Sequence, residues 1–463
     1  EMETKTETKM KMETEMETEM ETEMETEMET KMETKMETKM ETKMEYSTLS
    51  QNLNEQITKE TRKNEGIYFT PISCINKNIE VLKPYISNKK NYTILEPSCG
   101  SCEFIVTLNK LYPKTTITGV EQNNDIYSSI KSLSTKNINL ICDDFLKLDI
   151  THKYDLIIGN PPYFVMKKSA VDNSYFEYFE GRPNIFILFI IKACSLLKEN
   201  GLLSFVLPKN FTNCLYYDKT RKYINHHFKI VDIIDCDTEF LETRQETIIL
   251  IIQNKVENVT ATANATANNN NDNDNDKFIL TRNDYTIFGI PENIEKMKEL
   301  YDNSTSLCEM GFKVNVGTVV WNECKNILTD DVTKTRLIYS SDIEKSELNL
   351  KNYKNNDKKN YIDKEGLSSP VLLLNRGYGK GVYKFEYCLF NPEDDIKYLI
   401  ENHLICVRYK EELERTELLE KYEHLITSLK DERTQSFVKY YFGNNAINTK
   451  ELSHILPMYK EEN

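Results

Sequence analysis

The segment Asn160-Pro161-Pro162-Tyr163 carries the residue types that point most directly to chemistry in this chain. It follows an apolar run, 156–159, that is typical of a buried strand. A planar aryl or amide NH2 group is a poor nucleophile, and two hydrogen-bond acceptors would orient it and stabilise positive charge during attack. The Asn160 side-chain carbonyl and the Pro161 main-chain carbonyl are two such acceptors. The segment therefore predicts methyl transfer to an amino or amide nitrogen.

The other residues of the tetrapeptide suit the same chemistry. Pro161 and Pro162 fix φ and remove backbone donors, so the loop presents acceptors and stays rigid. Tyr163 offers a flat face on which a ring can stack. The alternative interpretation is a proline-stiffened turn that leaves a strand and has no catalytic role.

The elements that must position this segment alternate between strands and helices. Helical stretches, notably Ile185–Leu197, are expected between the first five strands, and the last two strands are expected to form an antiparallel edge pair. This rhythm is typical of a doubly wound α/β sheet. The expected strands are Tyr92–Leu95, Thr116–Val120, Ile138–Cys142, Tyr154–Ile158, Leu202–Leu207, Val231–Ile234 and Thr247–Ile252.

Polar residues follow four of these strands, at the sheet edge where ligands bind in open α/β proteins. Glu96 ends the first strand, and Glu121 ends the second, where an acid typically holds ribose hydroxyls. Asp144 and Phe145 follow the third, and Asn160 follows the fourth. Each acid alone is better explained as a solvated strand end, but four polar groups in register, three acids and Asn160, indicate a nucleotide-like ligand. A nicotinamide dehydrogenase shares the Glu121 feature, yet it has no need of the tetrapeptide and favours more glycines.

Charge is unevenly distributed along the 463 residues, whose net charge is −15. Residues 1–45 hold 16 Glu and 7 Lys, which gives −9, and residues 256–276 hold one Glu and three Asp, which gives −4. The rest of the chain therefore carries only −2, and a nucleic-acid substrate is not excluded. Eleven cysteines without a signal peptide predict reduced thiols inside the cell, in the cytoplasm or nucleus. No membrane span is expected, and the histidines show no metal-ligand spacing.

Three regions are predicted. Residues 1–45 form a low-complexity Met/Glu/Thr/Lys repeat that is expected to be disordered. Residues 46–299 are expected to form the catalytic domain, with a low-complexity insertion at 256–277. Residues 300–463 lose the α/β rhythm and are expected to form a separate domain with an amphipathic helix around Glu411–Leu429. In that domain the segment 375–384 interleaves basic, aromatic and glycine residues, which suits nucleic-acid contacts through Arg376 and Lys380 but equally an ordinary hairpin.

The motifs together resemble those of the gamma-class, TaqI-like DNA adenine-N6 methyltransferases, well over residues 60–255 and loosely over 300–463. This resemblance implies a Rossmann-like methyltransferase sheet, a C-terminal target-recognition domain and double-stranded DNA as substrate. The sequence does not give the oligomeric state, and a monomer is favoured. It implies S-adenosylmethionine as cofactor, held by Tyr68, Thr70, Pro71, Glu96, Ser98, Gly100, Glu121, Asp144, Phe145 and Asn160. It assigns catalysis to residues 160–163 and stacking of a flipped-out adenine to Tyr163 and Phe240.

One departure from that family is Cys102, where the cofactor loop normally has glycine. It leaves open an inactive, DNA-binding relative. Cys99 and Cys102 also form a C-x-x-C pair, but no second pair at suitable spacing supports a zinc site. Related enzymes that methylate RNA adenine or a protein glutamine amide remain alternatives, although the residues beyond 300 favour DNA. A fused restriction-modification enzyme would need a nuclease carboxylate cluster, and none is evident.

Overall fold

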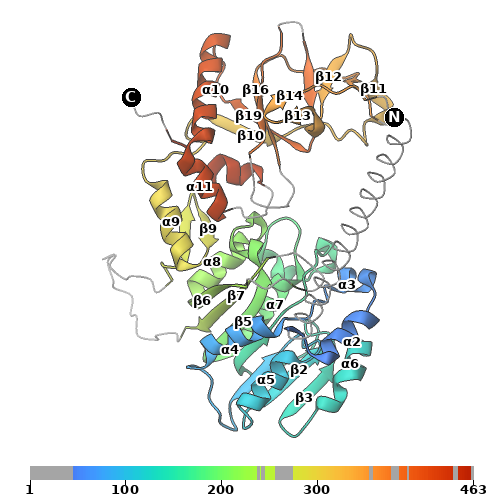
Figure 1. The fold of residues 1–463 in the computed structure, drawn as a ribbon, viewed down its shortest axis with the longest axis vertical. Coiled ribbons are helices and arrows are strands. Elements are labelled where there is room, and N and C mark those ends of the chain that lie inside the picture. Colours follow the sequence, from blue (N-terminus) through green and yellow to red (C-terminus); the bar gives the residue numbers. More distant parts are fainter. Residues whose placement is uncertain are drawn as a thin grey trace, which may run out of the picture. The chain divides into compact units, whose positions relative to one another are not determined.

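The computed structural model describes residues 45–236, 240, 246–255, 275–353, 358–376, 385–393, 396–441 and 447–459. The chain divides into two compact units (Figure 1). Unit 1 comprises Glu1–Met166, Asn184–Pro208 and Asp235–Val256, and unit 2 comprises Lys167–Pro183, Lys209–Ile234 and Glu257–Asn463. The predicted N-terminal repeat and the insertion at 256–277 lie almost entirely outside the described residues, and the predicted domain bounds stay a prediction.

A seven-stranded sheet in the order β3-β2-β1-β4-β5-β7-β6 organises the N-terminal half of the chain. Strands β1 to β5 pair in parallel, whereas β7 runs antiparallel to β5. The predicted α/β, Rossmann-like class is therefore confirmed. The strands are β1 (Thr93–Glu96), β2 (Thr116–Glu121), β3 (Ile138–Cys142), β4 (Tyr154–Gly159), β5 (Leu197–Pro208), β6 (Phe228–Cys236) and β7 (Thr247–Asn254).

The central strands form because their apolar runs can be buried on both faces, as a parallel sheet requires. Ile94, Leu95 and the run Leu156–Ile158 are fully buried. Helix α7 is apolar on nearly every side and is buried accordingly. The helices of this half are α2 (Thr48–Gln56), α3 (Lys59–Glu65), α4 (Ile72–Leu82), α5 (Glu103–Leu111), α6 (Asn124–Ile130), α7 (Ile185–Ser195) and α8 (Asp218–His227).

One detail of the predicted sheet was wrong. Residues 143–153, between β3 and β4, contain no helix, because turns and bends fill this short connection. The last two strands are neighbours at the edge of the sheet, as predicted, with β7 between β5 and β6. Pairing of β7 with β5 buries residues 247–252 of β7.

Besides α8 and most of β6, unit 2 contains smaller sheets and three further helices. Four strands pair in the order β10-β19-β16-β17 and four in the order β11-β15-β12-β18, and β8-β9 and β13-β14 are hairpins. The strands are β8 (Ile279–Arg282), β9 (Tyr285–Phe288), β10 (Phe312–Val316), β11 (Leu328–Thr329), β12 (Thr335–Ile338), β13 (Ile343–Glu344), β14 (Glu347–Leu348), β15 (Tyr361–Ile362), β16 (Val371–Asn375), β17 (Tyr387–Phe390), β18 (Tyr398–Ile400) and β19 (Leu404–Tyr409). The helices are α9 (Pro291–Tyr301), α10 (Arg415–Lys430) and α11 (Glu432–Tyr441), and a π-helical turn spans Glu451–Ile455.

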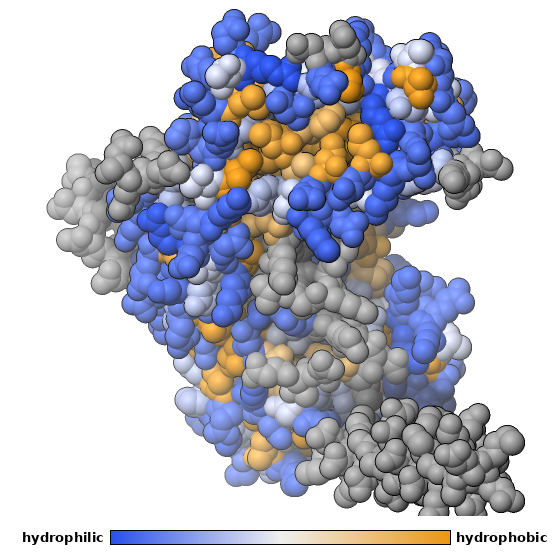
Figure 2. Space-filling view, turned by 45° about the horizontal axis from the view of Figure 1, so that its top comes forward, coloured by the Kyte–Doolittle hydropathy of each residue, from blue (hydrophilic) through white to orange (hydrophobic). Residues whose placement is uncertain are grey.

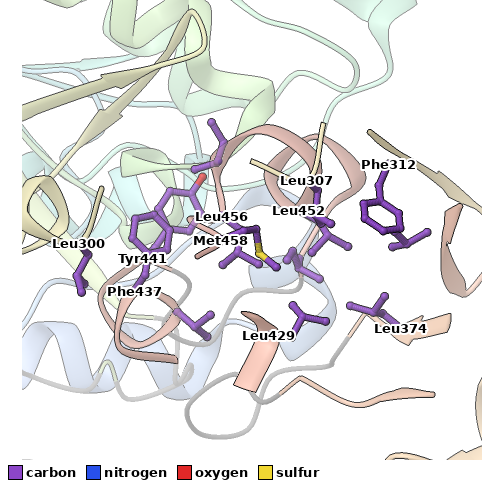
Figure 3. Packing of buried hydrophobic residues seen from close by; sticks show 14 of the residues in the cluster. Leu300, Leu307, Phe312, Leu374, Leu429, Phe437, Tyr441, Leu452, Leu456 and Met458 are labelled. Atoms are coloured by element: carbon purple, nitrogen blue, oxygen red, sulfur yellow. The ribbon is translucent and has the colours of Figure 1, made fainter. Parts of the chain in front are cut away.

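A large hydrophobic cluster holds unit 2 together, with α9, α10 and α11 packed over one face of the β10-β19-β16-β17 sheet (Figure 3). Leu374 and Phe312 come from strands, whereas Leu429 and Phe437 come from helices. The predicted amphipathic helix is α10, which places Tyr422, Leu425 and Leu429 in this cluster and leaves its other face in solvent.

On the face shown in Figure 2 most described residues are hydrophilic, and hydrophobic residues gather in a broad patch in the upper part of the view and in smaller patches elsewhere. Among the described residues, no helix is both long and apolar enough to cross a membrane.

Candidate active site

A pocket in unit 1 lies at the carboxyl ends of the parallel strands. Its empty volume is about 620 Å³, part of it open to solvent. Its wall combines the loops after β1, β2, β3 and β4 with the segment that leads into α4. The lining residues are Glu65, Gly66, Ile67, Tyr68, Phe69, Pro97, Ser98, Gly100, Glu121, Gln122, Asn123, Ile126, Asp143, Phe145, Asn160, Pro162 and Phe189.

Glu121 ties two of these loops together at the end of β2. One carboxylate oxygen accepts a hydrogen bond from the Gly100 N–H (2.9 Å), and the other accepts one from the Asn123 N–H (2.8 Å). Burial raises the pKa of Glu121, and these N–H donors oppose the rise by stabilising the charged form. The carboxylate is thus fixed on the pocket wall, where it can accept hydrogen bonds from ribose hydroxyls.

One end of the pocket is aromatic. The rings of Phe145 and Phe189 lie with their centroids 5.1 Å apart at a tilt of 43°, and both side chains are buried. Ile126 completes this apolar corner, which suits the flat face of an adenine ring. The acid that lines the pocket here is Asp143. The carboxylate of Asp144 instead accepts from the Leu146 N–H (3.0 Å) and pairs with Lys147 (3.1 Å).

The tetrapeptide follows β4 and borders the same pocket through Asn160 and Pro162. The Asn160 side chain donates from Nδ2 to the Tyr68 carbonyl (3.0 Å) and accepts at Oδ1 from the Tyr163 hydroxyl. The Asn160 main-chain carbonyl accepts from Ser98 Oγ (3.1 Å). Within the described residues, no hydrogen bond engages the Pro161 carbonyl. The loop thus carries two possible acceptors for an amino group, of which Asn160 lines the pocket and Pro161 follows it in the chain.

The structure brings together some of the residues that the sequence predicts at the site. Tyr68, Ser98, Gly100, Glu121, Phe145 and Asn160 line the pocket. Thr70, Pro71, Glu96 and Asp144 do not, and their cofactor roles stay predictions. Glu96 is buried behind the loop, where burial holds the pKa of its carboxyl well above the usual range.

Three residues outside the tetrapeptide are also predicted to contact the substrate, and the structure says less about them. Phe240 is buried, with only 5% of its surface exposed. The main-chain carbonyl of Arg376 accepts from the Ile447 N–H (3.2 Å) within unit 2. Lys380 lies outside the described residues. The roles of all three stay predictions.

Several pocket residues were missed by the sequence reasoning, among them Glu65, Gln122, Asn123, Ile126, Asp143 and Phe189. A signal existed for Asn123, because an Asn shortly after a strand-end acid often begins a helix, and Asn123 caps α6. No signal existed for Phe189, which lies in the uniformly apolar α7.

Cys102 adopts the left-handed backbone conformation that explains why glycine is usual at this position. Its φ is 63° and its ψ is 25°, and its side chain is fully buried and does not line the pocket. The neighbouring Cys99 thiol is also buried, and its hydrogen bond with Cys102, together with burial, raises its pKa well above the usual value. Neither cysteine lines the pocket.

We therefore expect Cys102→Gly to change the dissociation constant for S-adenosylmethionine by less than about twofold, because the thiol does not reach the pocket. The left-handed residue costs roughly 1 kcal/mol of strain, which glycine relieves while losing the buried thiol, so stability also changes little. Isothermal titration calorimetry of both proteins measures the affinity. A tenfold gain in affinity for the glycine variant would show instead that Cys102 impairs the cofactor site.

The strand order, the antiparallel β7, the acid that ends β2 and the tetrapeptide after β4 define a class of protein, the S-adenosylmethionine-dependent methyltransferases. The residues present fit this cofactor. Glu121 suits its ribose, the aromatic corner suits its adenine, and the loop from Pro97 to Gly100 admits its methionine part. Among the described residues, no group of three His, Cys, Asp or Glu side chains has the arrangement of a metal site.

Comparisons with known proteins show which methyltransferases this chain is similar to. Residues 21–241 match the family described as Eco57I restriction-modification methylase. The chain is 34% identical over 197 residues to the modification methylase CviBIII of Paramecium bursaria Chlorella virus NC1A, covering 41% of this chain and 51% of that protein. It is 24% identical over 364 residues to the type II methyltransferase M.CvrRI of Paramecium bursaria Chlorella virus XZ-6E, covering 77% of this chain and 86% of that protein.

Solved structures include one similar protein that spans most of the chain. The type IIG restriction endonuclease BpuSI aligns with 86% of this chain and 60% of its own, at 10% identity and a TM-score of 0.39. The chain spans about half the length of CviBIII. The family match and the sequence relatives confirm the resemblance to restriction-modification DNA methyltransferases, whose cofactor is S-adenosylmethionine.

Proposed function

We propose that the protein is a site-specific DNA methyltransferase that transfers a methyl group to the N6 amino group of adenine. The observation that carries this proposal is the position of Asn160, directly after β4 and on the wall of the cofactor pocket, with Pro161 next to it in the chain. Acceptors placed there meet a planar amino group beside the methyl donor. The names of the relatives, which are type II methyltransferases and modification methylases, support DNA as the substrate.

The residues of the tetrapeptide catalyse the reaction by orienting the amino group of the substrate. Asn160 Oδ1 and the Pro161 carbonyl accept hydrogen bonds from the two N–H groups of the amino substrate, and they stabilise the positive charge that develops on its nitrogen. The ring of Tyr163 stacks against the base. S-adenosylmethionine supplies the methyl group, activated by its attachment to a sulfonium, so no covalent enzyme intermediate is required.

The target adenine must leave the duplex to reach these acceptors, because its amino group is paired inside double-stranded DNA. Tyr163 and Phe240 are the proposed stacking partners of the flipped base. Unit 2 is the proposed reader of the recognition sequence, through residues such as Arg376 and Lys380. A monomer suffices for this reaction, since all the proposed roles fall within one chain.

Incubation of the purified protein with tritiated S-adenosylmethionine tests the proposal. Mixed-sequence duplex DNA, RNA and a protein release factor serve as parallel substrates. We expect label on DNA only, and we expect nucleoside digestion to yield N6-methyladenosine in its deoxy form. Label only on RNA or on a glutamine amide would contradict the proposal that DNA is the substrate. Label on cytosine would contradict the proposal that adenine is the methylated base.

A further inference from the structure

Helix α2 precedes all the residues that line the cofactor pocket, yet it is fastened to the loop after β1, from Pro97 to Cys102, here called the cofactor loop. Ser50 of α2 is fully buried. Its hydroxyl lies 2.8 Å from the hydroxyl of Ser101 and 2.6 Å from a carboxylate oxygen of Glu103. A buried hydroxyl is costly unless it has such partners, so the position of Ser50 depends on the loop, and the position of the loop depends on Ser50.

The contact is a network of three serine hydroxyls around one carboxylate. Ser47, which caps α2, also donates to Glu103, and its oxygen accepts from the Ser50 N–H at 3.1 Å. A carboxylate only accepts, so Ser47 and Ser50 each use their one proton on Glu103, and the Ser101 hydroxyl can donate to Ser50. Because α5 begins at Glu103, the network joins the N-terminal turns of α2 and α5.

Ser101 is the next residue in a run that is otherwise held by the sheet. The three residues before it each donate a hydrogen bond to β2 or to the loop after β4. The donors are Ser98 Oγ (3.1 Å), the Cys99 N–H (2.8 Å) and the Gly100 N–H (2.9 Å). The side chain of Ser101 is instead held by α2. The helix therefore supports the cofactor loop from the side that the sheet does not reach.

The backbone of the cofactor loop needs support because left-handed residues flank Ser101. Gly100 has a φ of 49° and Cys102 a φ of 63°. For a residue with a side chain this conformation costs about 1 kcal/mol, and it persists where the surrounding structure holds it. Gly100 also lines the cofactor pocket. A contact that fixes Ser101 thus fixes the pocket wall beside it.

A hydrophobic cluster holds α2 against the same pocket. Leu53 of α2 is buried in a cluster with Phe69 and Ile126, and Ile67 packs against this cluster. Ile67, Phe69 and Ile126 all line the pocket. Helix α2 therefore supports the pocket wall at two places, through hydrogen bonds to the cofactor loop and through apolar packing behind the segment that leads into α4.

We propose that α2 is part of the cofactor site and that Ser50 is a positioning residue, which holds the cofactor loop in the shape that binds S-adenosylmethionine. Ser50 does not line the pocket, so it acts through Ser101 and Glu103 rather than by touching the cofactor. The inference concerns cofactor binding alone and does not depend on the proposed substrate.

Ser50→Ala tests this role because it removes both contacts with the loss of one oxygen. We expect the dissociation constant for S-adenosylmethionine, measured by calorimetry without DNA, to rise about 10-fold, the effect of one hydrogen bond to a charged group. The reason is that ordering the loop then consumes part of the binding free energy. A Ser50→Ala protein with the affinity of the wild type would overturn the proposal.

Ser204→Ala is the matched control for this variant. Ser204 is fully buried in the same unit, its hydroxyl lies 2.6 Å from Asn78 Oδ1, and it does not line the pocket. This substitution removes the same atom from an equally buried hydrogen bond, so it reproduces a general loss of stability. We expect it to leave the dissociation constant within about twofold of the wild type. An equal rise in both variants would contradict a specific role for Ser50.

A second background shows whether Ser50 acts through the loop. Ser101→Ala combined with Glu103→Ala removes both partners of Ser50 and should itself weaken cofactor binding about 10-fold. Adding Ser50→Ala to this background should change the dissociation constant by less than about twofold, because the contact is already absent. A further 10-fold loss would mean that Ser50 acts by another route, and the proposal would be wrong.

Hydrogen exchange gives a readout other than affinity. The N–H groups of Cys99, Gly100 and Cys102 are hydrogen-bonded within unit 1, and mass spectrometry of peptides that span residues 97–103 follows them. Without cofactor, we expect these peptides to exchange about fivefold faster in Ser50→Ala than in the wild type, and saturating S-adenosylmethionine to remove the difference. Peptides from α10 should exchange equally in both proteins. Unchanged exchange in the loop, or faster exchange throughout the chain, would overturn the inference.

Discussion

Asn160→Ala is expected to lower the rate of methyl transfer by about 10²- to 10³-fold. The variant removes a preorganised acceptor from the place where positive charge develops, and the loss of one such group has effects of this size. The Pro161 carbonyl and the aromatic groups remain, so weak activity persists. Tritium incorporation into duplex DNA under single-turnover conditions measures the loss directly.

Cofactor binding gives the control for this variant. Glu121, the aromatic corner and the loop from Pro97 to Gly100 are unchanged, so the dissociation constant for S-adenosylmethionine should stay within about fivefold. Asn139→Ala, at an exposed position on β3, is the matched substitution and should leave the rate unaltered. Transfer by Asn160→Ala at a rate close to that of the wild type would refute the catalytic role of the tetrapeptide.

The sheet could be predicted because its strands are continuous apolar runs rich in Ile, Leu and Val. Six of the seven predicted strands agree with the observed ones within about three residues at either end, as for β2 and β3. The exception is β5, which begins at Leu197 and passes through the polar residues Lys198 to Asn200. The pattern of apolar residues in the sequence could not reveal where this strand begins. The position of β7 between β5 and β6 was not predicted either. Strands β5 and β6 follow each other in the sequence, but they are not neighbours in the sheet.

Site residues that belong to a sequence motif could be predicted. Site residues whose role depends on the direction in which their side chain points could not. Glu121 and Asn160 line the pocket as expected, since both lie at the ends of parallel strands. Asp143 and Asp144 are adjacent, and only the conformation of the turn after β3 decides which carboxylate reaches the pocket. Phe189 could not be distinguished from its apolar neighbours on α7 without knowing which helical face meets Phe145.

The hydroxyl of Tyr163 illustrates a further limit. The sequence shows an aromatic residue after two prolines, and stacking is the role that its ring suggests. The carbonyls of Tyr68 and Val206, which make the hydroxyl and the amide into one hydrogen-bonded group, belong to main chain distant in sequence. Main-chain groups have no sequence signature, so this arrangement emerges only from the folded structure.

The second large effect concerns stability and arises from Glu451, a buried carboxyl in unit 2 with 4% of its surface exposed. It accepts from the Tyr441 hydroxyl (3.2 Å) and the Asn448 N–H (3.0 Å). Burial nevertheless raises its pKa from 4.5 to about 7. The folded protein therefore binds this proton more tightly than the unfolded chain, and the free energy of unfolding falls as pH rises from 4.5 to 7. The stabilisation present at pH 4.5 and lost by pH 8 is about 3 kcal/mol.

Glu451→Gln isolates this contribution, because glutamine keeps an acceptor but does not titrate. The chain has one tryptophan, Trp321, and it lies in unit 2, so its fluorescence during urea unfolding follows this unit. We expect the free energy of unfolding of the wild type, minus that of the variant, to fall by about 3 kcal/mol between pH 4.5 and pH 8. Glu423→Gln, at an exposed position on α10, should leave the pH dependence unchanged. Parallel curves for the wild type and Glu451→Gln would mean that Glu451 ionises normally in the folded protein.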